Sequence, residues 1–91
     1  GVGASLRTAS DDILVGEVYE NSPAQRAGLH PGDIILSIDN QVVKGKTIDA
    51  VSTLLKGSPG TQVSLRVKDV MTGAEETRVV TRGEIELSSV P

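Results

Sequence analysis

The chain must build its core almost without aromatic side chains. Its 91 residues contain no Phe and no Trp, and Tyr19 is the only aromatic residue. Val, Ile and Leu must therefore fill the interior, and the β-branched members of this group are most frequent in strands. A chain of this length hides only about 60–65% of its unfolded surface, which allows one thin core. We therefore expect a single, mainly β domain.

The composition also excludes several classes of function. The chain has no Cys, so it has no disulfide, no thiol nucleophile and no thiolate metal site. Its formal net charge is −3 with both signs interspersed, whereas nucleic-acid binding calls for a basic face. No apolar run approaches the length of about 18 residues that spans a membrane. We therefore expect no nucleic acid, no membrane insertion, no metal and no cofactor.

Closely spaced turn signals divide the chain into segments that are mostly strands. In the segment 33–39, the alternation puts Ile34, Leu36 and Ile38 on one face and Ile35 on the other. The complete set of predicted strands covers residues 4–8, 13–19, 33–39, 42–43, 61–69 and 75–82.

A short helix is predicted over residues 23–27. The hydroxyl of Ser22 can accept a hydrogen bond from an unpaired amide, and proline at position 23 needs no amide of its own. Gly28 is expected to end the helix in the left-handed conformation.

A longer helix is predicted over residues 47–56. Thr47 caps its first turn, and Gly57 is expected to close its last turn. Its apolar residues lie three or four positions apart and form one stripe that faces inward. The stripe consists of Ile48, Val51, Leu54 and Leu55.

The order of these elements implies a mainly antiparallel β fold of the α+β type. Five or six strands would form a partial barrel, and the two helices would cap its open ends. Residues 1–82 are expected to form this domain, and residues 83–91 to serve as a linker. A small curled sheet of this kind leaves one strand edge beside a helix.

Two adjoining segments resemble a known family. Residues 22–29 read Ser-Pro-Ala-Gln-Arg-Ala-Gly-Leu, and residues 31–39 read Pro-Gly-Asp-Ile-Ile-Leu-Ser-Ile-Asp. Together they resemble the signature S-P-A-x-x-A-G-[LI]-x-x-G-D-x-I-[LV]-x-[IV]-[DN]-G of PDZ domains, and the resemblance covers residues 1–82. Asn40 departs from the usual glycine, although asparagine can adopt the same backbone conformation. The resemblance implies a PDZ fold that binds peptides.

Further fragments are similar to the PDZ domain of C-terminal processing peptidases, also called tail-specific proteases. The opening Gly1-Val2-Gly3-Ala4 leads directly into a strand, as in the circularly permuted bacterial arrangement. Similar fragments lie at residues 44–47, 55–61, 81–82, 84–85 and 89–90. This resemblance implies a serine peptidase core elsewhere in the parent chain. It also implies an extracytoplasmic location, in a bacterial envelope or a thylakoid lumen.

Two physical devices explain how such a domain would bind. An open strand edge can accept an extended peptide, and successive amides of a glycine-rich loop can hold a terminal carboxylate. By position, Val2, Gly3 and Ala4 supply these amides, and the pairing edge runs from Ala4 to Arg7. Gly1 and Gly3 are expected because the loop must approach the ligand without a side chain in the way.

A pocket for a ligand side chain is expected between this strand and the longer helix. Helical spacing places Ile48, Ser52 and Leu55 along it, and the small Ala4 leaves room for a terminal Ala, Val or Leu. Ile48 stands where many eukaryotic PDZ domains carry histidine, so a hydrophobic ligand residue is expected there. The full set of predicted peptide-binding residues is Val2, Gly3, Ala4, Ser5, Leu6, Arg7, Ile48, Ser52 and Leu55.

Several of these residues also have a purely structural interpretation. Ile48 and Leu55 can belong to the core, and the opening glycines can be a cut end. His30 has no carboxylate or second histidine spaced to orient it, so we expect no chemical role for it. Asp33 is expected to accept hydrogen bonds from turn amides rather than to act as a base.

Three functions are compatible with the sequence. The leading hypothesis is a binding module that captures protein C-termini with apolar ends and delivers them to, or unblocks, the protease core of its own parent chain. A scaffold domain that assembles partners without a protease is the alternative. An autonomous hydrolase ranks third, because no set of nucleophile, base and orienting group is visible.

Overall fold

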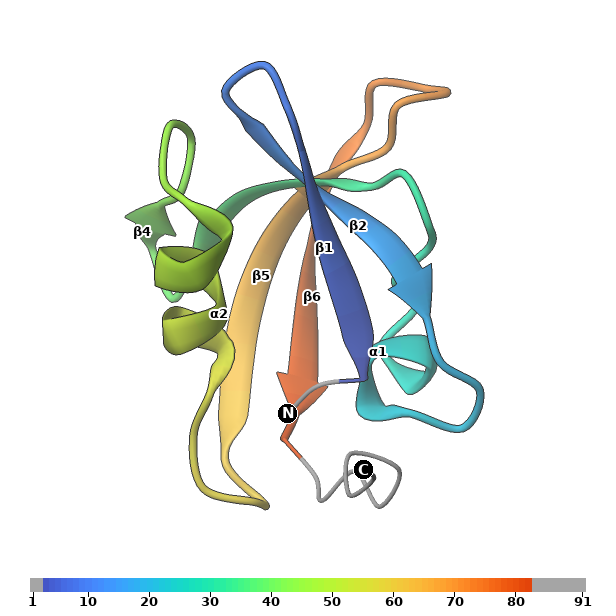
Figure 1. Cartoon of the computed structure of the whole chain (residues 1–91). Coiled ribbons are helices and arrows are strands. Elements are labelled where there is room, and N and C mark those ends of the chain that lie inside the picture. The colour runs from blue at the N-terminus through green and yellow to red at the C-terminus, as the bar shows by residue number, and fades with distance from the viewer. Residues whose placement is uncertain (1–2, 83–91) are drawn as a thin grey trace.

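The computed structural model describes residues 3–82, which form a curled antiparallel sheet with two helices (Figure 1). The mainly β fold predicted from the sequence is therefore confirmed. The strands are β1 (Ala4–Ala9), β2 (Asp12–Val18), β3 (Ile34–Ile38), β4 (Gln41–Val42), β5 (Gln62–Lys68) and β6 (Glu75–Thr81). The helices are α1 (Pro23–Arg26) and α2 (Ile48–Leu55). Between residues 3 and 82, neither helix is long and apolar enough to cross a bilayer.

The sheet is open, and its two outermost strands are the first and the last of the described chain. The strand order is β1-β2-β3-β5-β6, and the short β4 pairs with β3 to one side. All strand pairings within residues 3–82 are antiparallel. In Figure 1, α2 lies along one side of the curled sheet and α1 near the opposite side. Each outermost strand contacts one helix, since α2 contacts β1 and α1 contacts β6.

The faces predicted for β3 are wrong. Ile35 and Ile38 are buried, whereas Ile34 and Leu36 are only half-buried. The pairing register with β5 shifts immediately after Ile35, and an extra residue of this kind reverses the direction of the side chains that follow it. Simple alternation therefore fails in the middle of the strand.

The core is wholly aliphatic, as the composition required. β2, β3, β5 and β6 all contribute buried side chains, and α2 covers them with Val51 and Leu55. The largest fully buried side chains are Ile13, Val15, Ile38, Val43, Val51, Val63, Leu65 and Val80.

Both helices begin as the sequence predicted. The Oγ of Ser22 accepts a hydrogen bond from the N–H of Gln25 at 3.2 Å, and the Oγ1 of Thr47 accepts one from Ala50 at 3.1 Å. Gly28 follows α1 with φ at 90°, the left-handed conformation expected for a residue that ends a helix.

The end of α2 differs from the prediction, because Gly57 does not close it in the left-handed conformation. Lys56 is already extended, and the side chain of Arg82 satisfies the last carbonyls of the helix. Arg82 donates from Nε to the oxygen of Leu55 at 2.8 Å and from Nη2 to the oxygen of Leu54 at 3.3 Å. A Cβ on Gly57 would lie 2.6 Å from Cζ of Arg82. Glycine is therefore needed here to leave room for the guanidinium.

Arg82→Ala is expected to lower the free energy of unfolding by about 1–2 kcal/mol, because charged donors to the helix carbonyls are lost. Arg66→Ala is the matched control. The exposed Arg66 side chain has one hydroxyl partner and one ion pair at 3.7 Å, so its removal should change stability by less than about 1 kcal/mol. Urea unfolding monitored by circular dichroism measures both values. Equal losses for the two variants would contradict the capping role of Arg82.

Candidate functional site

The outer edge of β1 has no strand partner among residues 3–82. β1 pairs with β2 alone, through a two-residue turn that makes Ala9 and Asp12 a directly opposed pair. Such a pair closes a hairpin with hydrogen bonds, and the bonds then alternate along the strand. The N–H and C=O groups of Leu6 and Thr8 consequently point away from β2. They can be satisfied by an additional strand.

An apolar cleft of about 220 Å³ lies between this edge and α2. Its lining residues are Ala4, Ser5, Leu6, Ile48, Ser52, Leu55 and Lys56. The structure thus brings together six of the nine residues selected from the sequence. Arg7 lies farther along β1 and does not line the cleft, Gly3 precedes the strand, and Val2 falls outside the described residues.

Lys56 was missed by the sequence analysis. It directly follows the last residue of α2 and is exposed at the cleft. The signal was available, because Lys56 lies four positions after Ser52 and therefore belongs to the same side of the helix.

Ser5 stabilises the edge strand from within the domain. Its Oγ accepts a hydrogen bond from the N–H of Glu17 at 2.8 Å, and the register of β1 with β2 shifts between Ala4 and Leu6 at the same place. Two residues of β2, Gly16 and Glu17, thus lie opposite the single residue Ser5, so the extra residue of this bulge belongs to β2.

Gly3 is constrained by the protein's own packing, in addition to the reason given for it from the sequence. Its φ is 86°, and a Cβ at this position would overlap the Cβ of Ser22, the residue that caps α1. Its carbonyl accepts a hydrogen bond from the N–H of Tyr19 at 2.9 Å. Gly3 is thereby fixed against the start of α1. Gly1 lies outside the described residues.

Asp33 has the structural role expected from the sequence. It is buried, and its Oδ2 accepts a hydrogen bond from the N–H of His30 at 3.0 Å. The His30 side chain is exposed. No three His, Asp or Glu side chains within the range 3–82 gather closely enough to hold a metal ion.

Comparison with known proteins agrees with this geometry. A family model described as PDZ domain matches residues 14–69. Probable CtpA-like serine proteases of Staphylococcus haemolyticus and Staphylococcus aureus are 34% and 36% identical to the chain over 91 residues, or 99% of it. The chain spans only 18% of the length of these relatives.

Two solved structures share the fold closely. A photosystem II D1 C-terminal processing protease superposes with a TM-score of 0.88 at 29% identity, covering 93% of this chain and 23% of that one. The PDZ domain of a carboxy-terminal protease from Vibrio cholerae, solved in complex with a peptide, gives 0.84 at 26% identity and covers 93% and 94%.

Gly3→Ala is expected to destabilise the domain more than Gly32→Ala. Both glycines have positive φ, at 86° and 94°, but no atom lies within 4 Å of a Cβ built on Gly32. Gly32→Ala should therefore cost only the backbone strain of about 1–2 kcal/mol, and Gly3→Ala a further 1–3 kcal/mol or so from the overlap with Ser22. Urea unfolding compares them, and equal costs would rule out the packing constraint.

Proposed function

Because the chain belongs to the PDZ domain family, we propose that its β1–α2 cleft captures the C-terminal end of a protein as an added strand. One observation carries the proposal: the unpaired edge of β1 runs beside an apolar cleft that α2 completes. The peptide bound to the Vibrio cholerae PDZ domain supports it further. An extended peptide gains main-chain hydrogen bonds from such an edge, and the cleft selects its side chains.

The volume and lining of the cleft support a small aliphatic end on the ligand. Its volume of about 220 Å³ and the short side chain of Ala4 leave space for a terminal Ala, Val or Leu. Ile48 and Leu55 supply apolar walls, and Leu6 offers both its side chain and its outward backbone groups. Each apolar group that leaves water on binding contributes favourably.

The amides of Gly3 and Ala4, together with that of Val2, are proposed to hold the ligand's terminal carboxylate. The positive φ of Gly3 and its fixation against Ser22 support this role, because both hold Gly3 in place before a ligand arrives. Successive amides in such a conformation form an anion-binding concavity. Lys56 adds a positive charge to the rim of the same cleft.

The parent protein is proposed to be a C-terminal processing serine peptidase. The identity of 34–36% to CtpA-like serine proteases extends along 99% of the chain and supports this assignment. The domain would then recruit substrate to the core or regulate it, and the catalytic serine and lysine would lie in that core. On the same resemblance we propose an extracytoplasmic location.

Binding rather than catalysis is the role proposed for the cleft itself. Ser52 and Lys56 are polar residues that line it, and a lysine that activates a serine must be desolvated so that it is neutral. Lys56 is instead exposed. This exposure favours a binding role.

Short peptides with a free, apolar C-terminus are expected to bind with Kd of roughly 10–100 μM, since one added strand and a shallow cleft yield about 5.5–7 kcal/mol. Amidating the terminus should weaken binding by about tenfold or more, because the charged acceptor is lost. Amide chemical shifts during titration of the ¹⁵N-labelled chain provide the measurement. Unchanged affinity after amidation would refute the carboxylate assignment for the Gly3–Ala4 loop.

Ile48→Asp should weaken peptide binding by about tenfold or more, because it places a charge in the apolar cleft. Ala50→Asp is the matched control, since it adds the same charge to the same turn of α2 at an exposed position. Isothermal titration of both folded variants measures the effect. If the control loses as much affinity as Ile48→Asp, the cleft is not the binding surface.

A further inference from the structure

The outer edge of β6 is a second edge that no strand of residues 3–82 pairs with. Flanking hydrogen bonds show which residues face β5, because the N–H of Arg82 donates to the oxygen of Thr61 at 2.7 Å and the N–H of Asp69 to that of Ala74 at 2.8 Å. The register between β5 and β6 is unbroken, so even-numbered residues bond β5 and odd-numbered residues face outward. The outward residues of β6 are Glu75, Thr77, Val79 and Thr81.

This edge has only some of the features that natural proteins use to protect an exposed strand, because β6 carries the charged residues Glu75, Glu76 and Arg78. Short length, proline, lysine and bulges discourage unwanted pairing, yet β6 has seven residues and none of the other three features. The outward Thr77, Val79 and Thr81 are β-branched and suit a strand. Val79 is 51% exposed, and Met71 in the adjoining β5–β6 turn is 90% exposed. The hairpin therefore presents both free backbone groups and apolar side chains.

The charges of β6 complement those of the same strand reversed. Its first half carries Glu75 and Glu76, and its second half carries Arg78, which also forms an ion pair with Glu76 of its own chain at 2.6 Å. In an antiparallel pair of identical strands, the acidic half of one lies against the basic half of the other. Opposite charges facing each other stabilise such a pair, and like charges destabilise it.

We propose that β6 pairs antiparallel with β6 of a second copy of this chain, with Thr77 opposite Thr77 at the twofold axis. In this register Glu76 faces Arg78 of the second copy, and Glu75 faces Val79. Centring the pair on Arg78 would instead oppose two identical guanidinium groups. Because each copy offers the same surface to the other, the assembly closes as a dimer.

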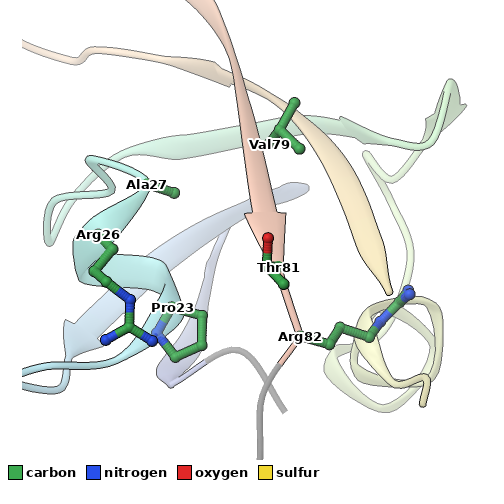
Figure 2. A pocket seen from close by; sticks show the side chains of 6 residues that line it. All are labelled: Pro23, Arg26, Ala27, Val79, Thr81 and Arg82. Carbon is green, nitrogen blue, oxygen red and sulfur yellow. The ribbon is translucent and has the colours of Figure 1, made fainter. Parts of the chain in front are cut away.

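A cleft beside the second half of β6 has room for the incoming strand (Figure 2). It measures about 410 Å³ and separates Pro23 of α1 and Ala27, which directly follows this helix, from Val79 and Thr81 of β6. The Arg82 side chain extends away from α1 in this view, toward the carbonyls of α2 that it caps. In the proposed register, the β5–β6 turn of the second copy reaches this cleft.

The first test is self-association of the 91-residue chain, measured by sedimentation equilibrium and by amide shifts on dilution. A dimer is expected whose shift changes follow β6 and α1 and persist when a C-terminal peptide saturates the β1 cleft. Val79→Pro should weaken association by about tenfold or more, because it removes an outward N–H while leaving the bonds to β5 intact. A monomer at every concentration, or association through β1, would overturn the proposal.

A matched pair of substitutions tests the register and does not depend on how proline is tolerated. Val79→Lys and Val79→Glu remove the same exposed side chain, and each faces Glu75 of the second copy. The lysine variant should associate about fivefold or more tightly than the glutamate variant. Equal association of the two folded variants would contradict the proposed register. If Val79→Lys, Val79→Glu and Val79→Pro all associate as the unchanged chain does, β6 is not the interface.

Discussion

The organisation of this domain depends on backbone hydrogen bonds that its own sheet does not complete. A sheet with the order β1-β2-β3-β5-β6 has two ends, and the outward groups of each end must be satisfied by water or by another chain. Each end also runs beside a helix, so that α2 flanks β1 and α1 flanks β6. The fold therefore has two comparable surfaces, at β1 and at β6, and each combines a strand edge without a partner strand in residues 3–82 with an adjoining cleft. Only the first has a glycine loop at its entrance.

The core beneath these two strands is aliphatic and contains no large aromatic side chain. Since no Phe or Trp is present, the core consists of many small contacts between Val, Ile and Leu side chains. Polar side-chain contacts additionally hold the peripheral elements in place. Ser22 supplies one, because it caps α1 and packs against Gly3. Arg82 supplies another by joining the end of α2 to the start of β5. The contacts of Ser22 and Arg82 both lie next to the proposed peptide site, so polar side-chain contacts help to define the shape of this site.

Much of this arrangement could be predicted from the sequence because local rules determined it. Ser22 and Thr47 cap the two helices because serine and threonine hydroxyls can accept hydrogen bonds from the first helical amides. Six of the nine selected site residues line one cleft, and helical spacing predicted those that α2 contributes. The failures occurred where a distant residue decided the local geometry. The β3 bulge depends on pairing with β5, and Gly57 depends on Arg82, 25 positions later in the sequence (82 minus 57). Such contacts leave no periodic trace in the sequence.

The position of Arg82 has a consequence for biosynthesis. Chains emerge from the ribosome with the N-terminus first, so β1 and α2 are available well before the residue that fastens α2 in place. A nascent chain that ended just before Arg82 would contain every strand and helix. It would lack the hydrogen bonds from Arg82 to the last carbonyls of α2, the helix that forms one wall of the cleft. The contact that holds the end of α2 is therefore made only after every strand and helix of the domain has been synthesised.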